Sequence, residues 1–530
     1  MNNISSNKFN LKVLCYMAIA GITAISNYAI CADFYVDPIN GTAGGDGSAD
    51  NPWKSLQEVI DSGLIESYGW DSLPPDDGVS LVVINEGAPV KAKDTIRLHE
   101  GDYGALNLTG YYNKSDITVE AVDGEEARFT NLLIRSSSNW IFRGLTISPE
   151  YGESYDPATM IDIDSHDWNG PVHDITIDNC NLQSVDDVSK WTIDDWNDLP
   201  ANGINADGDN ITITNNYLRN VNFGISVGAT NSLIMGNTVE NFAGDGMRGL
   251  GDYSVFAYNT VKNCYDVNDN HDDGFQSWSV GDDGVGTGVV KGIVLRGNTI
   301  INYEDANQPF RGPLQGIGCF DGTFEDWTIE NNVIYTNHWH GISLYGARNC
   351  TIVNNTVLDP DNEDPGPPWI MITDHKDGTP PENCVIANNL TTAVSGSDLV
   401  TKEGNIIIDD PDNFFIDYAA LDFHLLPESS AVDSAVDEYA PSIDHDKIPR
   451  PAGAGFDVGA YEWHEESVKP VTDTDLAVED TDTSDVISDD LSNNTSDDSK
   501  SSSDTGGCGC SSIGKSETAS LSILRLIFLK

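Results

Sequence analysis

The chain has 530 residues and a formal net charge of −58, because 85 Asp and Glu residues stand against 27 Lys and Arg. A surface this acidic repels nucleic acid and anionic membranes, so neither is expected as a partner. An acidic ligand would need local cations or a bound metal to offset this charge.

Residues 1–32 are predicted to be a signal peptide. Lys8 and Lys12 precede an apolar run over residues 13–22, and small residues lead to a cleavage site after Ala32. The run is too short to span a membrane, and globular sequence follows at once. We therefore expect a secreted, extracellular protein.

Residues 33–61 predict a strand, a loop rich in Gly and Asp, and a short helix. The apolar spacing of Leu56, Val59, Ile60 and Leu64 indicates the helix, which would cover one open end of the fold that follows. The stretch DFYVDPINGTAGGDGSADNPWKSLQEVID resembles the opening of secreted parallel β-helix proteins. Strands in looser repeats continue over residues 81–147.

Residues 203–389 repeat one pattern, in which a Gly is followed by alternating apolar residues, a turn and a β-rich stretch that closes on Asn. The closing residues are Asn216, Asn237, Asn259, Asn298, Asn332, Asn355 and Asn389, at spacings of 21, 22, 39, 34, 23 and 34. The basal period is thus about 22, with insertions in the longer steps. So short a repeat buries its apolar face only against its neighbours, which predicts a solenoid with equivalent residues about 4.8 Å apart. A β-propeller, the nearest alternative, needs about 40 residues per blade.

The recurring Asn is interpreted as structural. At a sharp corner of each coil, Asn tolerates the left-handed conformation, and stacked amides can hydrogen-bond along the ladder. Cys180 takes the equivalent place in an earlier copy. Cys350 and Cys384 each precede their ladder Asn by five residues, so we expect them on adjacent coils near disulfide range, with their redox state open.

Residues 422–463 contain HLLPESSAVD, IPRP and FDVGAYEW in that order. They resemble a segment found at the end of many bacterial secreted β-helix proteins, where it closes the final coil. Together with the opening segment, this resemblance implies that residues 33–463 form an all-β, right-handed parallel β-helix solenoid of the pectin-lyase-like class. The chain is expected to be a monomer.

The last residues predict an attachment region. Residues 464–505 are acidic, rich in Ser, Thr and Asp, and without periodicity, which is typical of a disordered linker. Residues 506–530 contain GGCGC, an apolar stretch and a final Lys, and resemble the tripartite sorting tags of bacterial surface proteins. This suggests attachment to the cell surface, and whether the tag is processed stays open.

The strand that starts at each repeat Gly indicates a functional face, because its residues alternate between the interior and the surface. The inward positions are Ile204, Ile225, Met247, Phe275, Ile317, Ile342 and Ile370. The outward positions of the middle copies, with two residues from the adjoining loop, are Asp245, Arg248, His271, Asp272, Asp273, Gln276, Trp278, Gln315, His340 and Tyr345. The longest insertions, at residues 265–292 and 303–316, flank this patch, and binding residues concentrate on such loops. The patch predicts a carbohydrate cleft in which Gln276 and Gln315 bind substrate, and Trp278 and Tyr345 stack on it.

The first hypothesis for the reaction is a uronic-acid polysaccharide lyase or epimerase. Asp245, Asp272 and Asp273, stacked about 5 Å apart, could hold a Ca²⁺ ion that bridges to the acidic polysaccharide. Arg248 or His340 would act as the base, and Tyr345 or His271 as the acid.

The second hypothesis is a glycoside hydrolase. NADG at 205–208, HDDG at 271–274 and HG at 340–341 are similar to the ordered motifs of polygalacturonases. The resemblance implies that Asp207, Asp272 and Asp273 are acid and bases and that His340 assists. Two intervening copies separate Asp207 from Asp273, whereas that family places the motifs on adjacent coils, so Asp245 is the better-placed partner. A third hypothesis is a non-catalytic, glycan-binding or adhesive surface protein.

Overall fold

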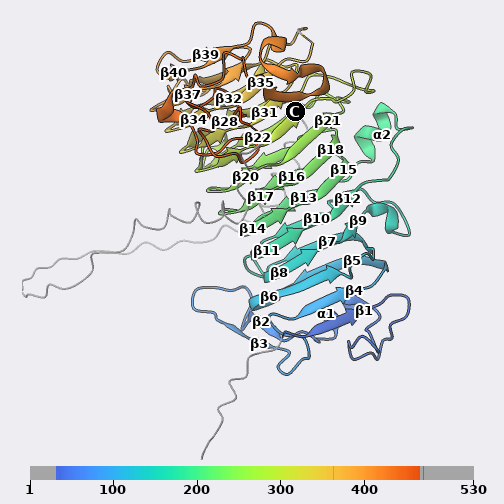
Figure 1. Ribbon diagram of the computed structural model, residues 1–530. Coiled ribbons are helices and arrows are strands. Elements are labelled where there is room, and N and C mark those ends of the chain that lie inside the picture. The colour runs from blue at the N-terminus through green and yellow to red at the C-terminus, as the bar shows by residue number, and fades with distance from the viewer. Residues whose placement is uncertain (1–30, 362, 466–469, 471–530) are drawn as a thin grey trace, which may run out of the picture. The chain divides into compact units, whose positions relative to one another are not determined.

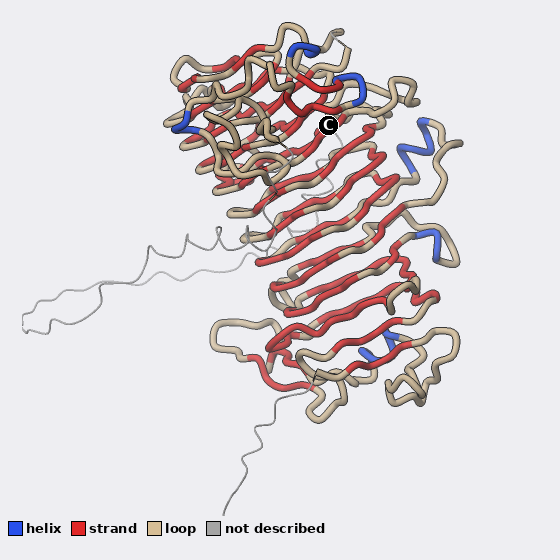
Figure 2. The backbone as a smooth tube through the Cα atoms, viewed as in Figure 1, coloured by secondary structure: helices blue, strands red, loops and turns tan. Residues whose placement is uncertain are grey.

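The computed structural model describes residues 31–361, 363–465 and 470, which all belong to one compact unit, residues 1–472. Strands stack in parallel along one axis and the chain winds from one layer to the next, as Figures 1 and 2 show. The predicted all-β solenoid is confirmed. None of the helices in these residues is long and apolar enough to cross a membrane. The predicted signal peptide, acidic linker and sorting tag lie almost wholly outside the described residues.

Each coil contributes strands to three parallel ladders. The first ladder contains β1 (Asp33–Val36), β4 (Thr95–Leu98), β6 (Tyr112–Ala121), β8 (Ser138–Arg143), β11 (His173–Asp178), β14 (Asp209–Thr214), β17 (Leu233–Met235), β20 (Val255–Ala257), β26 (Val294–Arg296), β30 (Thr328–Glu330), β34 (Thr351–Val353), β37 (Val385–Ala387) and β40 (Thr401–Glu403).

The second ladder carries the face predicted to be functional. It contains β5 (Gly101–Thr109), β7 (Ala127–Arg135), β10 (Ile161–Asp164), β13 (Ile204–Ala206), β16 (Ile225–Val227), β19 (Met247–Gly249), β22 (Asp273–Trp278), β28 (Gln315–Asp321), β32 (His340–Tyr345), β36 (Trp369–Thr373) and β39 (Val394–Gly396).

The third ladder closes each coil. It contains β9 (Thr146–Ile147), β12 (Asn181–Gln183), β15 (Tyr217–Val221), β18 (Thr238–Phe242), β21 (Thr260–Cys264), β27 (Thr299–Ile301), β31 (Val333–Tyr335), β35 (Thr356–Leu358), β38 (Leu390–Thr391) and β41 (Ile406–Ile407).

The remaining strands are short additions. They are β25 (Val289–Lys291), β29 (Thr323–Glu325) and β33 (Ala347–Arg348) in one parallel sheet, and the antiparallel pairs β2 (Ser67–Trp70) with β3 (Leu81–Ile84), β23 (Val280–Gly281) with β24 (Gly284–Val285), and β42 (Phe415–Asp417) with β43 (Asp422–Leu425).

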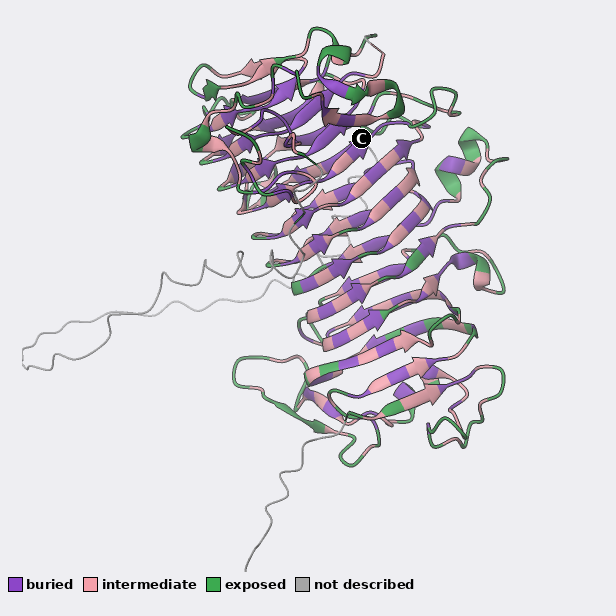
Figure 3. Ribbon diagram, viewed as in Figure 1, coloured by how far each residue is buried: buried purple, intermediate pink, exposed green. Residues whose placement is uncertain are grey.

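The core is the inside of the coil, as the alternation of buried and half-buried residues along the strands in Figure 3 shows. The predicted inward stack is confirmed, because all seven of its side chains are at most 1% exposed. Strand registers pair Met247 with Phe275, Phe275 with Ile317, and Ile317 with Ile342. Each residue therefore rests on its counterpart in the next coil.

The predicted amide ladder is confirmed. Asn216 Nδ2 donates to Asn237 Oδ1 at 2.9 Å, and the same bond recurs from copy to copy as far as Asn405. Cys180 joins it through its backbone N–H, which donates to Asn216 Oδ1. The left-handed conformation was predicted for the ladder Asn itself, and this is wrong by one residue. The residue directly before each ladder Asn adopts it. Those residues are Asn215, Gly236, Tyr258, Gly297, Asn331, Asn354 and Asn388.

The two segments that the sequence singled out as end covers both pack against the solenoid. The predicted helix is α1 (Leu56–Asp61), which buries Leu56, Val59 and Ile60 beneath the first coils. The segment over residues 422–463 lies along the outside of three successive coils rather than only on the last. Asn331 Nδ2 donates to Ile443 O, Asn354 Nδ2 to Asp457 O and Asn388 Nδ2 to Val436 O.

Cys350 and Cys384 lie on adjacent coils as predicted, because the neighbouring residues Thr351 and Val385 are paired in register. Both cysteines are free thiols and are buried.

Candidate functional site

The middle coils bring the predicted outward residues into one column on the second ladder. Asp273 pairs with Gln315 in register, and the backbone N–H of Asp273 donates to Asp245 Oδ1 at 3.1 Å. His340 begins β32, two coils from Asp273. Alternation along a parallel strand is enough to place these side chains together.

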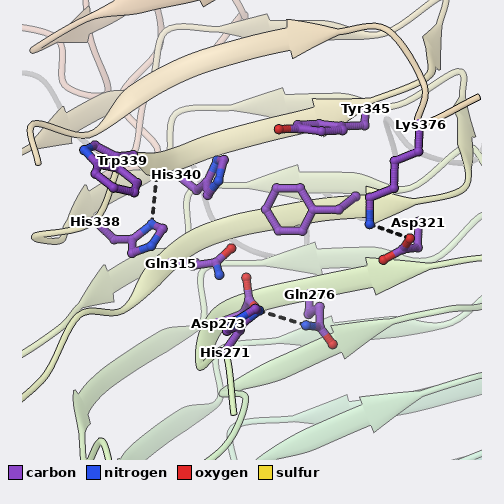
Figure 4. A pocket seen from close by; sticks show the side chains of 11 residues that line it. His271, Asp273, Gln276, Gln315, Asp321, His338, Trp339, His340, Tyr345 and Lys376 are labelled. Atoms are coloured by element: carbon purple, nitrogen blue, oxygen red, sulfur yellow. Dashed lines mark hydrogen bonds and ion pairs between the residues drawn. The ribbon is translucent and has the colours of Figure 1, made fainter. Parts of the chain in front are cut away.

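A cavity of about 400 Å³ opens beside this column, and we call it the β32 cavity (Figure 4). Its lining residues are His271, Asp273, Gln276, Gln315, Phe320, Asp321, His338, Trp339, His340, Tyr345 and Lys376. Six of them were predicted as site residues. Figure 4 places His338 and Trp339 on one side of the cavity and Asp321 with Lys376 on the other.

Asp273 is the most unusual group in the β32 cavity, because a fully buried carboxyl lines it. Oδ2 accepts a hydrogen bond from Gln276 Nε2 at 2.8 Å, while buried Oδ1 has no hydrogen-bond partner among the described residues. Burial raises the pKa of Asp273 well above its usual range, and the nearby charge of Asp245 adds to the rise. Burial thus favours the protonated form of Asp273, in which the carboxylic acid can donate a hydrogen bond.

Two neutral histidines face the same space. Burial lowers the pKa of His338 and of His340 to about 4. The backbone N–H of His340 donates to His338 Nδ1 at 3.1 Å, so the ring of His338 carries its hydrogen on Nε2.

The tautomer of His340 follows from Ser343, a buried residue on the same strand. Trp369 Nε1–H donates to Ser343 Oγ at 3.2 Å, and Ser343 Oγ lies 2.9 Å from His340 Nδ1. Because the serine hydroxyl has its own hydrogen to donate, we assign Nδ1 as the acceptor and Nε2 as the N–H of His340. This assignment favours His340 as a hydrogen-bond donor rather than as the predicted base.

The structure does not bring Arg248 or Trp278 into the β32 cavity. Arg248 Nε lies 2.6 Å from Oδ2 of buried Asp245, and its guanidinium stacks over the rings of Phe223 and Trp278 at 3.7 and 5.4 Å from their centroids. Because the guanidinium is engaged by Asp245 and two aromatic rings outside the cavity lining, this geometry does not support Arg248 as the base.

Asp272 and Asp207 also lie away from the cavity lining. Asp272 Oδ1 accepts from Asn270 Nδ2, and Oδ2 accepts from the Cys264 thiol. The coil of Asp207 is three steps from that of Asp273, and its pKa is raised by burial and then by Asp164 and Asp162. The two intervening copies are full coils, so Asp207 and Asp273 lie apart, as their spacing in the sequence indicates.

The three carboxylates predicted to bind Ca²⁺ do not fit that ion as they are arranged. Both oxygens of Asp245 and of Asp272 already accept hydrogen bonds. Of the three carboxyl groups, Asp273 Oδ1 is then the oxygen that is left to bind a metal ion. Ca²⁺ requires six to eight oxygen ligands. Within residues 31–361 and 363–465, no group of three His, Cys, Asp or Glu side chains is arranged to hold a metal ion. Calcium dependence stays a prediction without support from this geometry.

Sequence reasoning missed five residues that line the β32 cavity: Phe320, Asp321, His338, Trp339 and Lys376. His338 and Trp339 precede His340 directly in NHWHG, so their proximity could have been noted. Lys376 comes from the turn after β36, and its Nζ lies 2.6 Å from Asp321 Oδ1. No local pattern indicates where that turn lies.

A protein-family model described as a right handed beta helix region matches residues 202–386. The coil is right-handed. A search of curated proteins finds no match to this chain.

Several solved structures share the fold at low identity. Pectate lyase Pel9A is 15% identical, with a TM-score of 0.41, and the match covers 81% of this chain and 96% of the other. The mannuronan C-5 epimerase AlgE6 A-module of Azotobacter vinelandii is 13% identical at a TM-score of 0.41, over 59% and 84% of the two chains. A GH136 lacto-N-biosidase from Eubacterium ramulus is 14% identical, with a TM-score of 0.39, and the match covers 71% of this chain and 68% of the other. At these values the neighbours do not bear on function.

Proposed function

We propose that this β-helix protein is a carbohydrate-active enzyme that acts on uronic-acid polysaccharides by β-elimination or C5 epimerisation at the β32 cavity. The observation that carries the proposal is a group of hydrogen-bond donors in one cavity. Two neutral histidines face the buried carboxyl group of Asp273, whose protonated form burial favours. The signal peptide predicted over residues 1–32 is in keeping with action outside the cell, and the predicted C-terminal tag with attachment to its surface.

Neutral hydrogen-bond donors can stabilise the negative charge that builds up when a uronate loses its C5 proton. Removal of the C5 proton builds negative charge on the uronate carboxyl group, so donors aimed at that group stabilise the transition state. The Asp273 hydroxyl and the Nε2–H groups of His338 and His340 can supply them, with the amide of Gln315 in register beside Asp273. A protonated carboxyl also binds an anion without adding to the charge of a −58 chain.

Two further cavity residues can move protons. His271 and Tyr345, which the sequence predicted as acids, each carry a group suited to general acid or base catalysis. In elimination the C5 proton leaves to a base, the C4–O bond breaks, a C4=C5 double bond forms and the leaving oxygen takes a proton. In epimerisation a proton returns to C5 from the opposite face and the chain stays intact.

Hydrolysis is the second candidate, because Asp321 also lines the cavity, where Lys376 Nζ lies 2.6 Å from its Oδ1. The buried Asp273, with its raised pKa, and the ion-paired Asp321 match the two carboxyl groups of glycoside hydrolases. Asp273 begins β22, whereas Asp321 ends β28 on the next coil, so the two carboxyl groups come from opposite strand ends.

The test is incubation of the secreted chain with pectate, alginate and glycosaminoglycans, each with calcium and with chelator. A lyase produces an unsaturated uronide that absorbs in the ultraviolet, a hydrolase produces reducing ends without that absorbance, and an epimerase exchanges C5 hydrogen for deuterium in heavy water. If no uronan changes in any of these assays, the proposal is wrong.

Gly318 provides a prediction about the Asp273 position. A Cβ atom at Gly318 would lie 2.1 Å from Asp273 Oδ1, so Gly318→Ala must displace the carboxyl group. A displacement of about 1 Å costs on the order of a hundredfold in rate, and we expect that loss with little change in melting temperature. Gly44→Ala is the matched control, because its added Cβ meets nothing within 4 Å. Wild-type turnover in Gly318→Ala would contradict the placement.

A further inference from the structure

The rim of the β32 cavity holds an exposed tryptophan. Trp339 is 42% exposed, whereas Trp140, Trp196 and Trp327 in the same fold are each 1% exposed. It lies directly before β32 and lines the cavity beside His338 and His340. A large apolar ring left in solvent next to a polar cavity indicates a contact surface.

Trp369 on the next coil extends this surface. The two indole planes are 12° from parallel, with centroids 6.4 Å apart. The backbone N–H of Trp369 donates to Trp339 O at 2.8 Å, and its Nε1–H donates to Ser343 Oγ. The ring of Trp369 is thus held by its own hydrogen bond, and the backbone of Trp339 is fixed beside it, which reduces the entropy lost on binding.

The cavity is too small for a polymer. A volume of about 400 Å³ is at the lower end of what a small-molecule site offers, so a long substrate must cross a rim. One side is formed by His338 and Trp339 and the other by Asp321 and Lys376, as Figure 4 shows. Sugar rings have one apolar C–H face and a polar hydroxyl edge, and this combination fits an indole face bordered by imidazole N–H groups.

We infer that Trp339, supported by Trp369, is a stacking subsite for the sugar unit next to the one that reacts. This inference rests on the proposed function and specifies the substrate as an oligomeric or polymeric glycan chain. Short substrates that fill only the cavity do not reach Trp339, whereas longer chains also stack on its ring.

The test compares Trp339→Ala, Trp339→Phe and wild type on galacturonate and mannuronate oligomers of two to six units. Calorimetry gives the affinity of each oligomer, and turnover gives KM and kcat separately. For the longest oligomers we expect Trp339→Ala to weaken binding and raise KM about tenfold, with kcat nearly unchanged, because an aromatic contact contributes roughly this much. The shortest oligomers should bind all three proteins equally, and Trp339→Phe should recover most of the loss. Trp168→Ala is the control, because Trp168 is 56% exposed in a turn of the early coils.

The outcomes separate this inference from the proposed function. If wild type transforms uronans and Trp339→Ala matches it on long chains, or loses affinity equally at every length, the subsite is wrong and the function stands. If wild type binds long chains through Trp339 and transforms none, the subsite stands and the function is wrong. If wild type neither binds nor transforms any oligomer and also leaves pectate, alginate and glycosaminoglycans unchanged, both are wrong.

Discussion

Asp273→Ala is expected to lower the turnover of the uronan substrate by about 10²–10³-fold, because it removes a buried donor from the transition state. Asp273→Asn keeps the size and a neutral N–H donor, so its loss should be clearly smaller. In a hydrolase Asp273 would have to transfer its proton, and Asn would then be as inactive as Ala. The measurement is kcat for both variants on the same polymer. If both variants lose activity equally and completely, the reaction is hydrolysis rather than elimination.

The pH profile tests the same group. Burial raises the pKa of Asp273 well above its usual range, so the protonated donor persists to a higher pH than in an exposed carboxyl group. Activity that depends on the protonated form is lost as pH rises through the raised pKa. Asp273→Asn cannot ionise, and its profile should lack this alkaline decline. An unchanged decline in Asp273→Asn would assign it to another group.

Phe275→Asp is expected to abolish folding. Phe275 is 1% exposed inside the coil, with edge-on ring contacts to Phe256 at 5.0 Å and Trp327 at 6.5 Å. An unpaired carboxylate there would cost several kcal/mol, comparable with the whole stability of many domains. The measurements are soluble yield, circular dichroism and urea unfolding.

Tyr253→Asp is the matched control for that substitution. Tyr253 is 55% exposed and lies in a turn, so the change should alter the free energy of unfolding by no more than about 0.5 kcal/mol. Phe275→Leu should keep the fold with a smaller loss. A Phe275→Asp protein that unfolds at the wild-type urea concentration would contradict the predicted core.

The candidate site could be predicted only in part. Asp273, Gln315 and His340 were found because each stands just before its repeat Gly, and parallel register turns that spacing into a column. Arg248 has an equally regular position, but its ion pair with Asp245 turns it away from the cavity. Strand position fixes the face of a side chain, whereas its partners decide where the functional group points.

The sequence by itself determined the solenoid, its inward stack and its amide ladder, because a period near 22 with internal alternation leaves one way to bury the apolar residues. Only the tertiary structure decided the chemistry of the site. The raised pKa of Asp273 depends on burial between coils, the hydrogen on His340 depends on Ser343 and Trp369, and Lys376 reaches the cavity from a turn. Desolvation and side-chain hydrogen bonds arise from neighbours distant along the chain, so no local pattern specifies them.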